Sequence, residues 1–185
     1  MTQTSTPHHH SFLSRVLGAA TLRAGTYEEV EADRRANGQA VLVVALSSLA
    51  AGIGTRGFGA GSAGDVVFFS GVALMAWVSW AFVVYAIGSR LIPEPQTRAD
   101  VGELLRTTGF AAAPGIIRVA GIWPAIATLV FTVATVWMLL AMIVAVRQAL
   151  EYTTTARAIA VCLLGWALAI AIAVGFGFFF GPTVS

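Results

Sequence analysis

The sequence predicts an all-helical membrane protein: a bundle of five transmembrane helices preceded by amphipathic helices on the cytoplasmic side. Of its 185 residues, 57% are hydrophobic and only 11% are charged, whereas about 25% of residues are charged in soluble proteins. The 40 residues from Thr107 to Val146 include one charge, Arg118. Because a bilayer core about 30 Å thick is crossed by about 20 helical residues, this stretch suffices for two crossings. Composition and length therefore indicate a polytopic membrane protein.

Residues 1–36 are expected to form a cytoplasmic tail with interfacial helices. Apolar residues recur there at helical spacing, with Arg15 and Arg23 off their face. This pattern is typical of a short helix that lies on the membrane surface, or of one that packs on soluble parts of the protein. The apolar residues are Phe12, Leu13, Val16, Leu17 and Ala20.

A second helix is expected to begin at a capping box formed by Thr26 and Glu29. It is expected to continue through Glu31 and Arg35, which are spaced as an i,i+4 pair, and on into the first span. The acidic residues of this segment are expected to form a solvated face; a docking surface for a partner is the alternative. They are Glu28, Glu29, Glu31 and Asp33.

Residues 37–182 are expected to form the transmembrane domain. The first span is short and contains Ser47 and Ser48, and the second has 23 residues without a charge. Asp100 and Glu103 are spaced to cap the helix that begins the third span. The five spans cover about residues 37–54, 66–88, 104–121, 124–146 and 158–180.

The arginines predict the orientation, since cytoplasmic loops are enriched in Arg and Lys. With five spans and the N-terminus inside, nine arginines are cytoplasmic, and Arg56 and Arg118 lie outside. A four-span arrangement, in which Thr107 to Arg118 is re-entrant or lies on the surface, leaves eight inside and three outside. Five spans are therefore favoured, with the C-terminus outside. The composition, rich in Arg and Ala and free of Lys, indicates a GC-rich genome and a bacterial inner membrane.

Two residues in the middle of the chain are candidate functional positions. Pro114 has no backbone N–H, so it is expected to kink the third span, either as a static packing feature or as a hinge or substrate-lining break. Arg118 would cost about 2.5–3.5 kcal/mol at the centre of a span. Because it lies fourteen residues after Leu104, it is expected near the outer interface, as an anchor or as a contact for an anion or lipid headgroup.

Two stripes of residues are further candidates. Thr128, Thr132 and Thr135 fall on one face of the fourth span, where they are expected to pack against partners or, alternatively, to line a water-filled path or a lipid groove. In the fifth span, small residues lie four apart along one face and are expected to allow close helix packing, within the bundle or across a homodimer. They are Gly165, Ala169, Ala173 and Gly177.

The predicted spans lack the side chains that catalysis requires. They contain no Asp, Glu, His or Lys, so no intramembrane acid, base, metal site or proton relay is expected. Cys162 is the only cysteine, which excludes an intrachain disulfide and a cysteine metal cluster. A net charge of +2 gives no support for nucleic-acid binding. We therefore expect no enzyme, no cofactor and no nucleic-acid partner.

Three segments of the second half follow one another at a characteristic spacing: residues 104–114 (LLRTTGFAAAP), 136–140 (VWMLL) and 147–160, where RQAL precedes TARAIA. In this order they resemble bacterial members of the Yip family, the Ypt/Rab-interacting membrane proteins, over about residues 12–180. The resemblance implies a five-helix membrane domain with a cytoplasmic N-terminus. In eukaryotes the family is associated with Rab-type GTPases, vesicle trafficking and the shaping of endomembranes. It implies no site residues here.

These observations predict a non-enzymatic protein with a membrane-organising, trafficking or adaptor role. It is expected to act within the lipid bilayer through helix–helix contacts, and through a protein partner or self-association. The alternative is a small transporter, channel or lipid-translocating module that uses the kinked third span and the polar stripe of the fourth. A small subunit of a larger complex is a third possibility.

Overall fold

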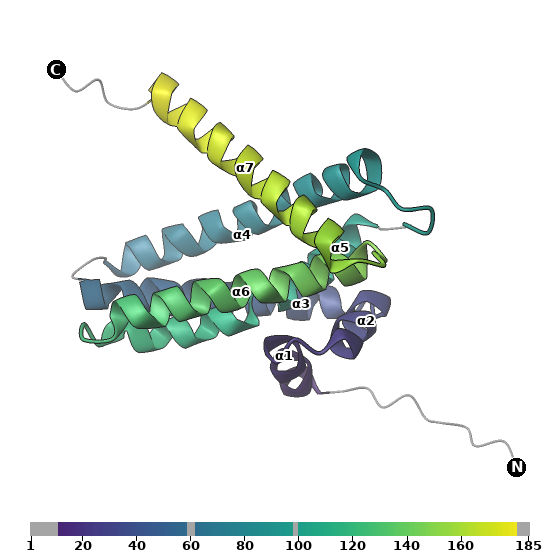
Figure 1. Cartoon of the computed structure of the whole chain (residues 1–185). Coiled ribbons are helices and arrows are strands. Elements are labelled where there is room, and N and C mark those ends of the chain that lie inside the picture. The colour runs from purple at the N-terminus through teal and green to yellow at the C-terminus, as the bar shows by residue number, and fades with distance from the viewer. Residues whose placement is uncertain (1–10, 59–61, 98–99, 181–185) are drawn as a thin grey trace, which may run out of the picture.

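The computed structural model describes residues 11–58, 62–97 and 100–180, without the side chains of residues 57–58, 63, 65, 68–70, 72–73, 169–170 and 172–180. Every regular element in these ranges is a helix (Figure 1). Three helices in this part of the chain are long and apolar enough to cross a membrane: Ala36–Gly54, Leu74–Leu91 and Ala127–Ala149. They correspond to the first, second and fourth predicted spans and indicate a membrane protein. The third and fifth crossings stay predictions.

Short helices and long ones both occur along the chain. Two short helices precede the first long one, and 3-10 or π segments continue three of the later helices. The elements are α1 (Phe12–Ala20), α2 (Ala24–Ala32), α3 (Ala36–Gly54), η1 (Thr55–Phe58, 3-10), α4 (Ala63–Ala86), η2 (Ile87–Leu91, π), α5 (Val101–Phe110), η3 (Ala113–Ile122, 3-10), α6 (Ala127–Ala149) and α7 (Thr155–Phe180).

The second predicted helix begins earlier and ends sooner than its sequence suggests. α2 already starts at Ala24, so Thr26 lies inside it and forms no capping box with Glu29. The Thr26 side chain instead fits against Gly18 of α1, where a Cβ would lie 2.2 Å from the Thr26 hydroxyl oxygen. α2 ends at Ala32 because Asp33 adopts extended backbone angles (φ −95°, ψ 97°). The expected continuation into the first span is therefore wrong.

The third predicted span is not one continuous α-helix. α5 ends at Phe110, and η3 begins at Ala113 in the tighter 3-10 form. Pro114 lies at the start of η3 and has no N–H to donate, so an α-helical hydrogen-bond ladder is interrupted there. The expected break at Pro114 is present, as a change of helix type. Asp100 and Glu103 form the expected capping box at the start of α5.

The segment formed by α5 and η3 is buried from residue 106 to residue 115. It packs against α3 and α6, and α4 packs on both α3 and α5. Two glycines permit the close approach of η3 to α3. A Cβ at Gly115 would lie 2.1 Å from the Ser47 hydroxyl oxygen, and one at Gly54 would lie 2.0 Å from the Arg118 carbonyl oxygen. Large side chains that are fully buried around this segment include Tyr27, Val43, Val84, Leu104, Phe110 and Leu150.

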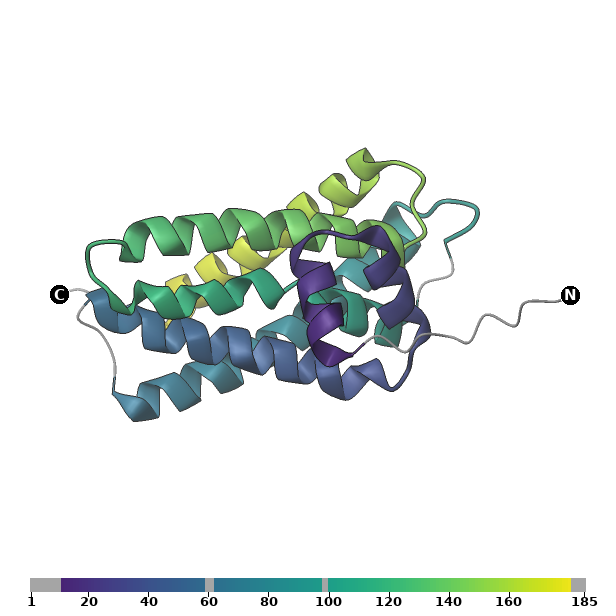
Figure 2. The same cartoon turned by 90° about the horizontal axis from the view of Figure 1, so that it is seen from below.

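The two ends of the bundle differ in character. At one end, which we call the polar end, α2 lies near residues 92–97 and 150–154 (Figure 1). At the other, which we call the Gly54 end, α3 ends and α6 begins. α7 starts at the polar end and diverges from the other helices (Figure 1). Figure 2 shows the bundle from below, with α1 (purple) lying across the direction of α3 and α6.

Candidate functional site

Arg15 holds α1 in place. It is only 3% exposed, and its guanidinium donates to Glu29 Oε1 (2.9 Å), Asp33 Oδ2 (2.8 Å) and Gln39 Oε1 (3.0 Å). These bonds tie α1 to α2 and to the start of α3. The acidic segment is therefore not the solvated face expected from the sequence, because two of its carboxylates form ion pairs with Arg15.

The apolar residues of α1 divide between two sides: Phe12, Val16 and Ala20 pack against the core, whereas two leucines face outward. Leu13 and Leu17, one turn apart, are 68% and 65% exposed. The end of α1 is fixed by Trp137 of α6, whose indole N–H donates to the Ala20 carbonyl (2.7 Å). Trp137 lies twelve residues before the end of α6, which corresponds to about 18 Å of helix. α1 therefore crosses the flank of the bundle beside a helix that is long and apolar enough to span a membrane (Figure 2).

Arg106 joins α5 to the end of α2. It is 4% exposed. Its Nε donates to the carbonyls of Val30 and Glu31 (3.0 Å each), its Nη2 donates to the Glu31 carbonyl, and its Nη1 donates to Asn37 Oδ1 (3.3 Å). The last carbonyls of a helix have no partners within it and carry partial negative charge, so a buried guanidinium satisfies them.

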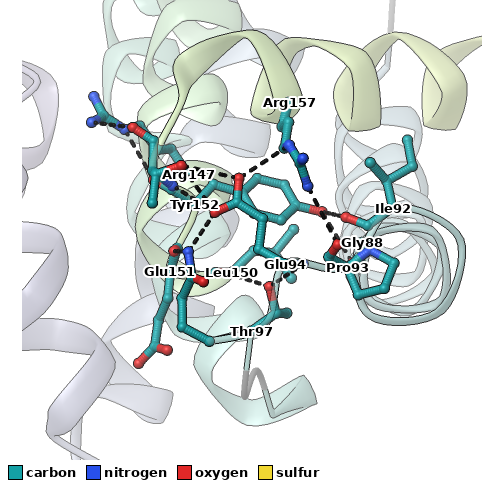
Figure 3. A network of polar contacts seen from close by, with 12 residues as sticks. Gly88, Ile92, Pro93, Glu94, Thr97, Arg147, Leu150, Glu151, Tyr152 and Arg157 are labelled. Atoms are coloured by element: carbon teal, nitrogen blue, oxygen red, sulfur yellow. Dashed lines mark hydrogen bonds and ion pairs between the residues drawn. The ribbon is translucent and has the colours of Figure 1, made fainter.

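Glu94 is a buried carboxylate at the polar end (Figure 3). It accepts hydrogen bonds from the Thr153 backbone N–H (3.2 Å) and hydroxyl (3.0 Å), and it forms an ion pair with Arg157 (3.1 Å). Burial acts to raise the pKa of the Glu94 carboxyl, but the Thr153 hydrogen bonds and the Arg157 charge outweigh it and lower that pKa. Glu94 is thus held as a carboxylate that joins residues 92–97 to the start of α7.

Tyr152 fixes the same turn to the end of η2. Its hydroxyl lies within hydrogen-bond distance of the carbonyl oxygens of Gly88 (3.0 Å) and Ile92 (2.7 Å), as Figure 3 shows. Glu151, the residue before it, takes a left-handed φ of 51°, which costs a non-glycine residue about 1–2 kcal/mol. The Glu94 cluster, defined as Glu94, Tyr152, Thr153 and Arg157, therefore positions the start of α7 despite a strained turn.

Glu31 titrates near neutral pH. Partial burial, followed by the charges of Glu103 and Glu151, raises the pKa of the Glu31 carboxyl to about 7, although Arg106 acts in the opposite direction. Each of these charges comes from a different element, since Glu103 belongs to α5 and Glu151 follows α6. The charge of the polar end therefore changes across the neutral range.

The candidates predicted from the sequence do not meet in one site. Pro114 is fully buried within the bundle, whereas Thr128, Thr132 and Thr135 are exposed on the outside of α6. Of the three threonines, Thr135 contacts another candidate, because its hydroxyl accepts a hydrogen bond from Arg118 Nη2 (3.1 Å). The threonine stripe thus faces outward and does not line a path through the interior of the bundle.

The Arg118 side chain extends along α6, away from the Gly54 end. Its backbone lies at the Gly54 end, but its Nη2 reaches Thr135, eight residues into α6. Its Cζ lies 5.7 Å from the centroid of the Phe131 ring, and its Nε is buried without a hydrogen-bond partner. Among the described side chains, no carboxylate forms an ion pair with it.

Gly165 is the described member of the small-residue stripe. It is buried, and a Cβ there would lie 2.8 Å from the indole ring of Trp80 on α4. Gly165 therefore lies against α4 within the bundle. The surroundings of Ala169, Ala173 and Gly177 are outside the described part of the chain, and their packing role stays a prediction.

The residues that organise the polar end were not singled out as candidates from the sequence. Arg106 and Glu94 meet partners about 75 and 59 residues away in the chain, and no local pattern indicates such contacts. Arg15 carried a weak signal, since it lies off the apolar face of a short helix and is followed by an acidic segment. That signal indicates a pairing without showing which acids take part.

Comparisons with known proteins assign no family. A scan against protein-family models, a search of curated proteins and a search of solved structures each found no match to the chain. Within residues 11–58, 62–97 and 100–180, no group of three His, Cys, Asp or Glu side chains could hold a metal ion. The placement of α1 and the network of polar contacts at the polar end are therefore the features that bear on function.

Proposed function

We propose that this chain is a non-enzymatic membrane-organising protein of the Yip type. It inserts α1 into one leaflet of the bilayer and presents its polar end to a protein partner or a second copy. The observation that carries the proposal is the orientation of α1: Arg15 is bound inward, while Leu13 and Leu17 point outward beside α6. The order of the segments between residues 104 and 160 supports the family type.

A helix held at this depth changes the packing of one leaflet. Each exposed leucine gains about 1.5–3 kcal/mol when it leaves water for apolar surroundings, so α1 favours contact with acyl chains. Because Arg15 and Trp137 attach α1 to the spanning helices, α1 increases the cross-sectional area of the protein in one leaflet only. Unequal cross-section in the two leaflets favours a curved membrane.

The proposal places the polar end on the cytoplasmic side of a bacterial inner membrane. In this orientation, with five crossings, nine arginines lie inside and the C-terminus lies outside. α1 then occupies the cytoplasmic leaflet. Its partners at the polar end are expected to be cytoplasmic or membrane proteins, or a second copy of the chain.

Reconstitution into liposomes tests the proposal. The purified chain is added at increasing protein-to-lipid ratio, and vesicle diameter and shape are measured by cryo-electron microscopy. We expect the wild-type chain to give smaller or tubular vesicles. The double variant Leu13→Glu/Leu17→Glu is expected to give vesicles like those without protein, because two carboxylates on the outer side of α1 oppose its insertion.

A matched control adds the same two charges elsewhere. Gly25 and Gly38 lie near the starts of α2 and α3, where a Cβ meets no atom within 4 Å and a carboxylate suits the helix dipole. The variant Gly25→Glu/Gly38→Glu is expected to remodel vesicles like the wild type. The proposal is wrong if the wild-type chain leaves vesicles unchanged, or if the leucine variant remodels them equally well.

A further inference from the structure

We infer that Arg118, together with the Thr132 hydroxyl, binds the phosphate group of a phospholipid from the leaflet at the Gly54 end. This leaflet is opposite to the one that α1 enters. Thr135, whose hydroxyl accepts from Arg118 and donates to the Phe131 carbonyl, positions the guanidinium. The inference rests on contacts of η3 and α6 alone, so it stands or fails independently of the proposed function.

Among the described side chains, the partners of Arg118 leave its charge incompletely neutralised. The guanidinium has five N–H donors, and the contacts in the structure are one hydrogen bond to Thr135 and the face of Phe131. Arg15 and Arg157, in contrast, each bind a carboxylate. Burial of a charge is costly unless a counter-charge or a full set of hydrogen bonds accompanies it. Because no described side chain supplies this counter-charge, we assign it to an anion from outside the chain.

The surface around Arg118 is apolar and exposed. On α6, Leu129 and Val136 are 64% and 53% exposed, and they flank the exposed threonines. Thr135 lies eight residues into α6, or about 12 Å from the start of the helix. Trp123, 62% exposed just before α6, is typical of an aromatic residue at the headgroup level. The guanidinium thus lies below the headgroups, where a lipid phosphate is drawn inward by local thinning of the leaflet.

The donors suit a phosphate group. Arginine binds phosphate through two parallel N–H bonds, a geometry that a lysine cannot provide. Thr132 lies one turn from Thr135 on the same exposed side of α6, and no hydrogen bond joins its hydroxyl to the other described residues. This hydroxyl is a further donor beside the guanidinium. Because apolar side chains surround the site, a phosphate that arrives attached to acyl chains is favoured over one from water.

Native mass spectrometry of the full chain in mild detergent tests the inference. The chain is mixed with phosphatidylglycerol or with a phosphate-free galactosyl diacylglycerol, and the lipid retained on the protein is counted. We expect wild-type protein to retain one phosphatidylglycerol and little galactolipid. Loss of charge-assisted hydrogen bonds in Arg118→Gln is expected to reduce retention about tenfold. Arg56→Gln, which removes the exposed arginine of η1 at the same end, is the matched control and should retain lipid like the wild type.

Two further arms keep the test decisive. Thr132→Val changes an exposed side chain, so it should fold normally and still lower phosphatidylglycerol retention. If Arg118→Gln retains as much phosphatidylglycerol as Arg56→Gln, or if the galactolipid is retained equally, no phosphate site exists at Arg118. If millimolar inorganic phosphate displaces the lipid completely, the site takes free phosphate, and the lipid source is wrong.

Discussion

Arg15, Arg106, Glu94 and Arg118 are all removed from water to some degree, and their partners differ. Arg15 binds two carboxylates, Arg106 binds helix-end carbonyls, and Glu94 binds Thr153 and Arg157. Each of these three has a set of partners that offsets the loss of water. Arg118 has one hydroxyl and an aromatic ring, and its incomplete set is the reason for proposing an external anion. At the scale of the residue, a charged side chain with a full set of partners stabilises the fold, whereas Arg118, whose set is incomplete, is proposed to bind a ligand.

Glu31 makes stability depend on pH. Because the pKa of its carboxyl rises from 4.5 to about 7 in the folded chain, the folded state binds more protons than the unfolded state between these values. The Glu31 contribution to stability is therefore fully present at low pH and is lost as pH rises through about 7. We expect the free energy of unfolding to fall from about pH 4.5 to about pH 7 and then to level off, measured by denaturant titration in detergent.

The variant Glu31→Gln is expected to remove most of this slope and to exceed the wild type in stability at about pH 8. Glu28→Gln is the control, because Glu28 is exposed and is the weakest of the charges acting on Glu31. A slope that persists in Glu31→Gln, or that disappears in Glu28→Gln alone, contradicts the assignment of the titrating group to Glu31.

At the scale of the element, local sequence predicted helices well where their ends are set locally. The capping box of Asp100 and Glu103 begins α5, as its spacing predicts. The same pattern at Thr26 and Glu29 was misleading, because Glu29 binds Arg15 and Thr26 fits against Gly18. These contacts join α1 to α2, so they cannot be predicted from the sequence of either helix alone. The change from α5 to η3 was predictable as a break at Pro114, but its 3-10 form depends on packing against α3.

Arg106 connects elements that are distant in the chain, so its removal should loosen α2 from α5. Arg106→Ala leaves the Val30 and Glu31 carbonyls unsatisfied, and we expect the free energy of unfolding to fall by about 2–3 kcal/mol. Arg34→Ala, which removes an exposed arginine beside α2, is expected to change it by less than about 0.5 kcal/mol. Equal stability of the two variants would show that Arg106 does not hold these elements together.

At the scale of the whole molecule, composition was enough to predict an all-helical membrane protein, because apolar runs of spanning length need no tertiary information. The position of α1 could not be derived in this way. Its amphipathic pattern fits both a membrane surface and a soluble interface, and only the contacts of Arg15 and Trp137 place it on the flank of the bundle. The same applies to the threonine stripe, whose outward direction depends on how α6 packs against η3.

The depth of α1 in the bilayer is the central claim, and spin labelling of the reconstituted full chain measures it directly. In a Cys162→Ala background, nitroxides are attached at Leu17→Cys and, for comparison, at Glu28→Cys, whose native side chain accepts a hydrogen bond from Gln148 at the end of α6 (3.3 Å). Collision rates with oxygen and with a water-soluble nickel chelate report depth. We predict that the Leu17 label is accessible to oxygen and protected from nickel, and that the Glu28 label shows the reverse. Equal accessibility of both labels to nickel would contradict the insertion of α1 into the leaflet.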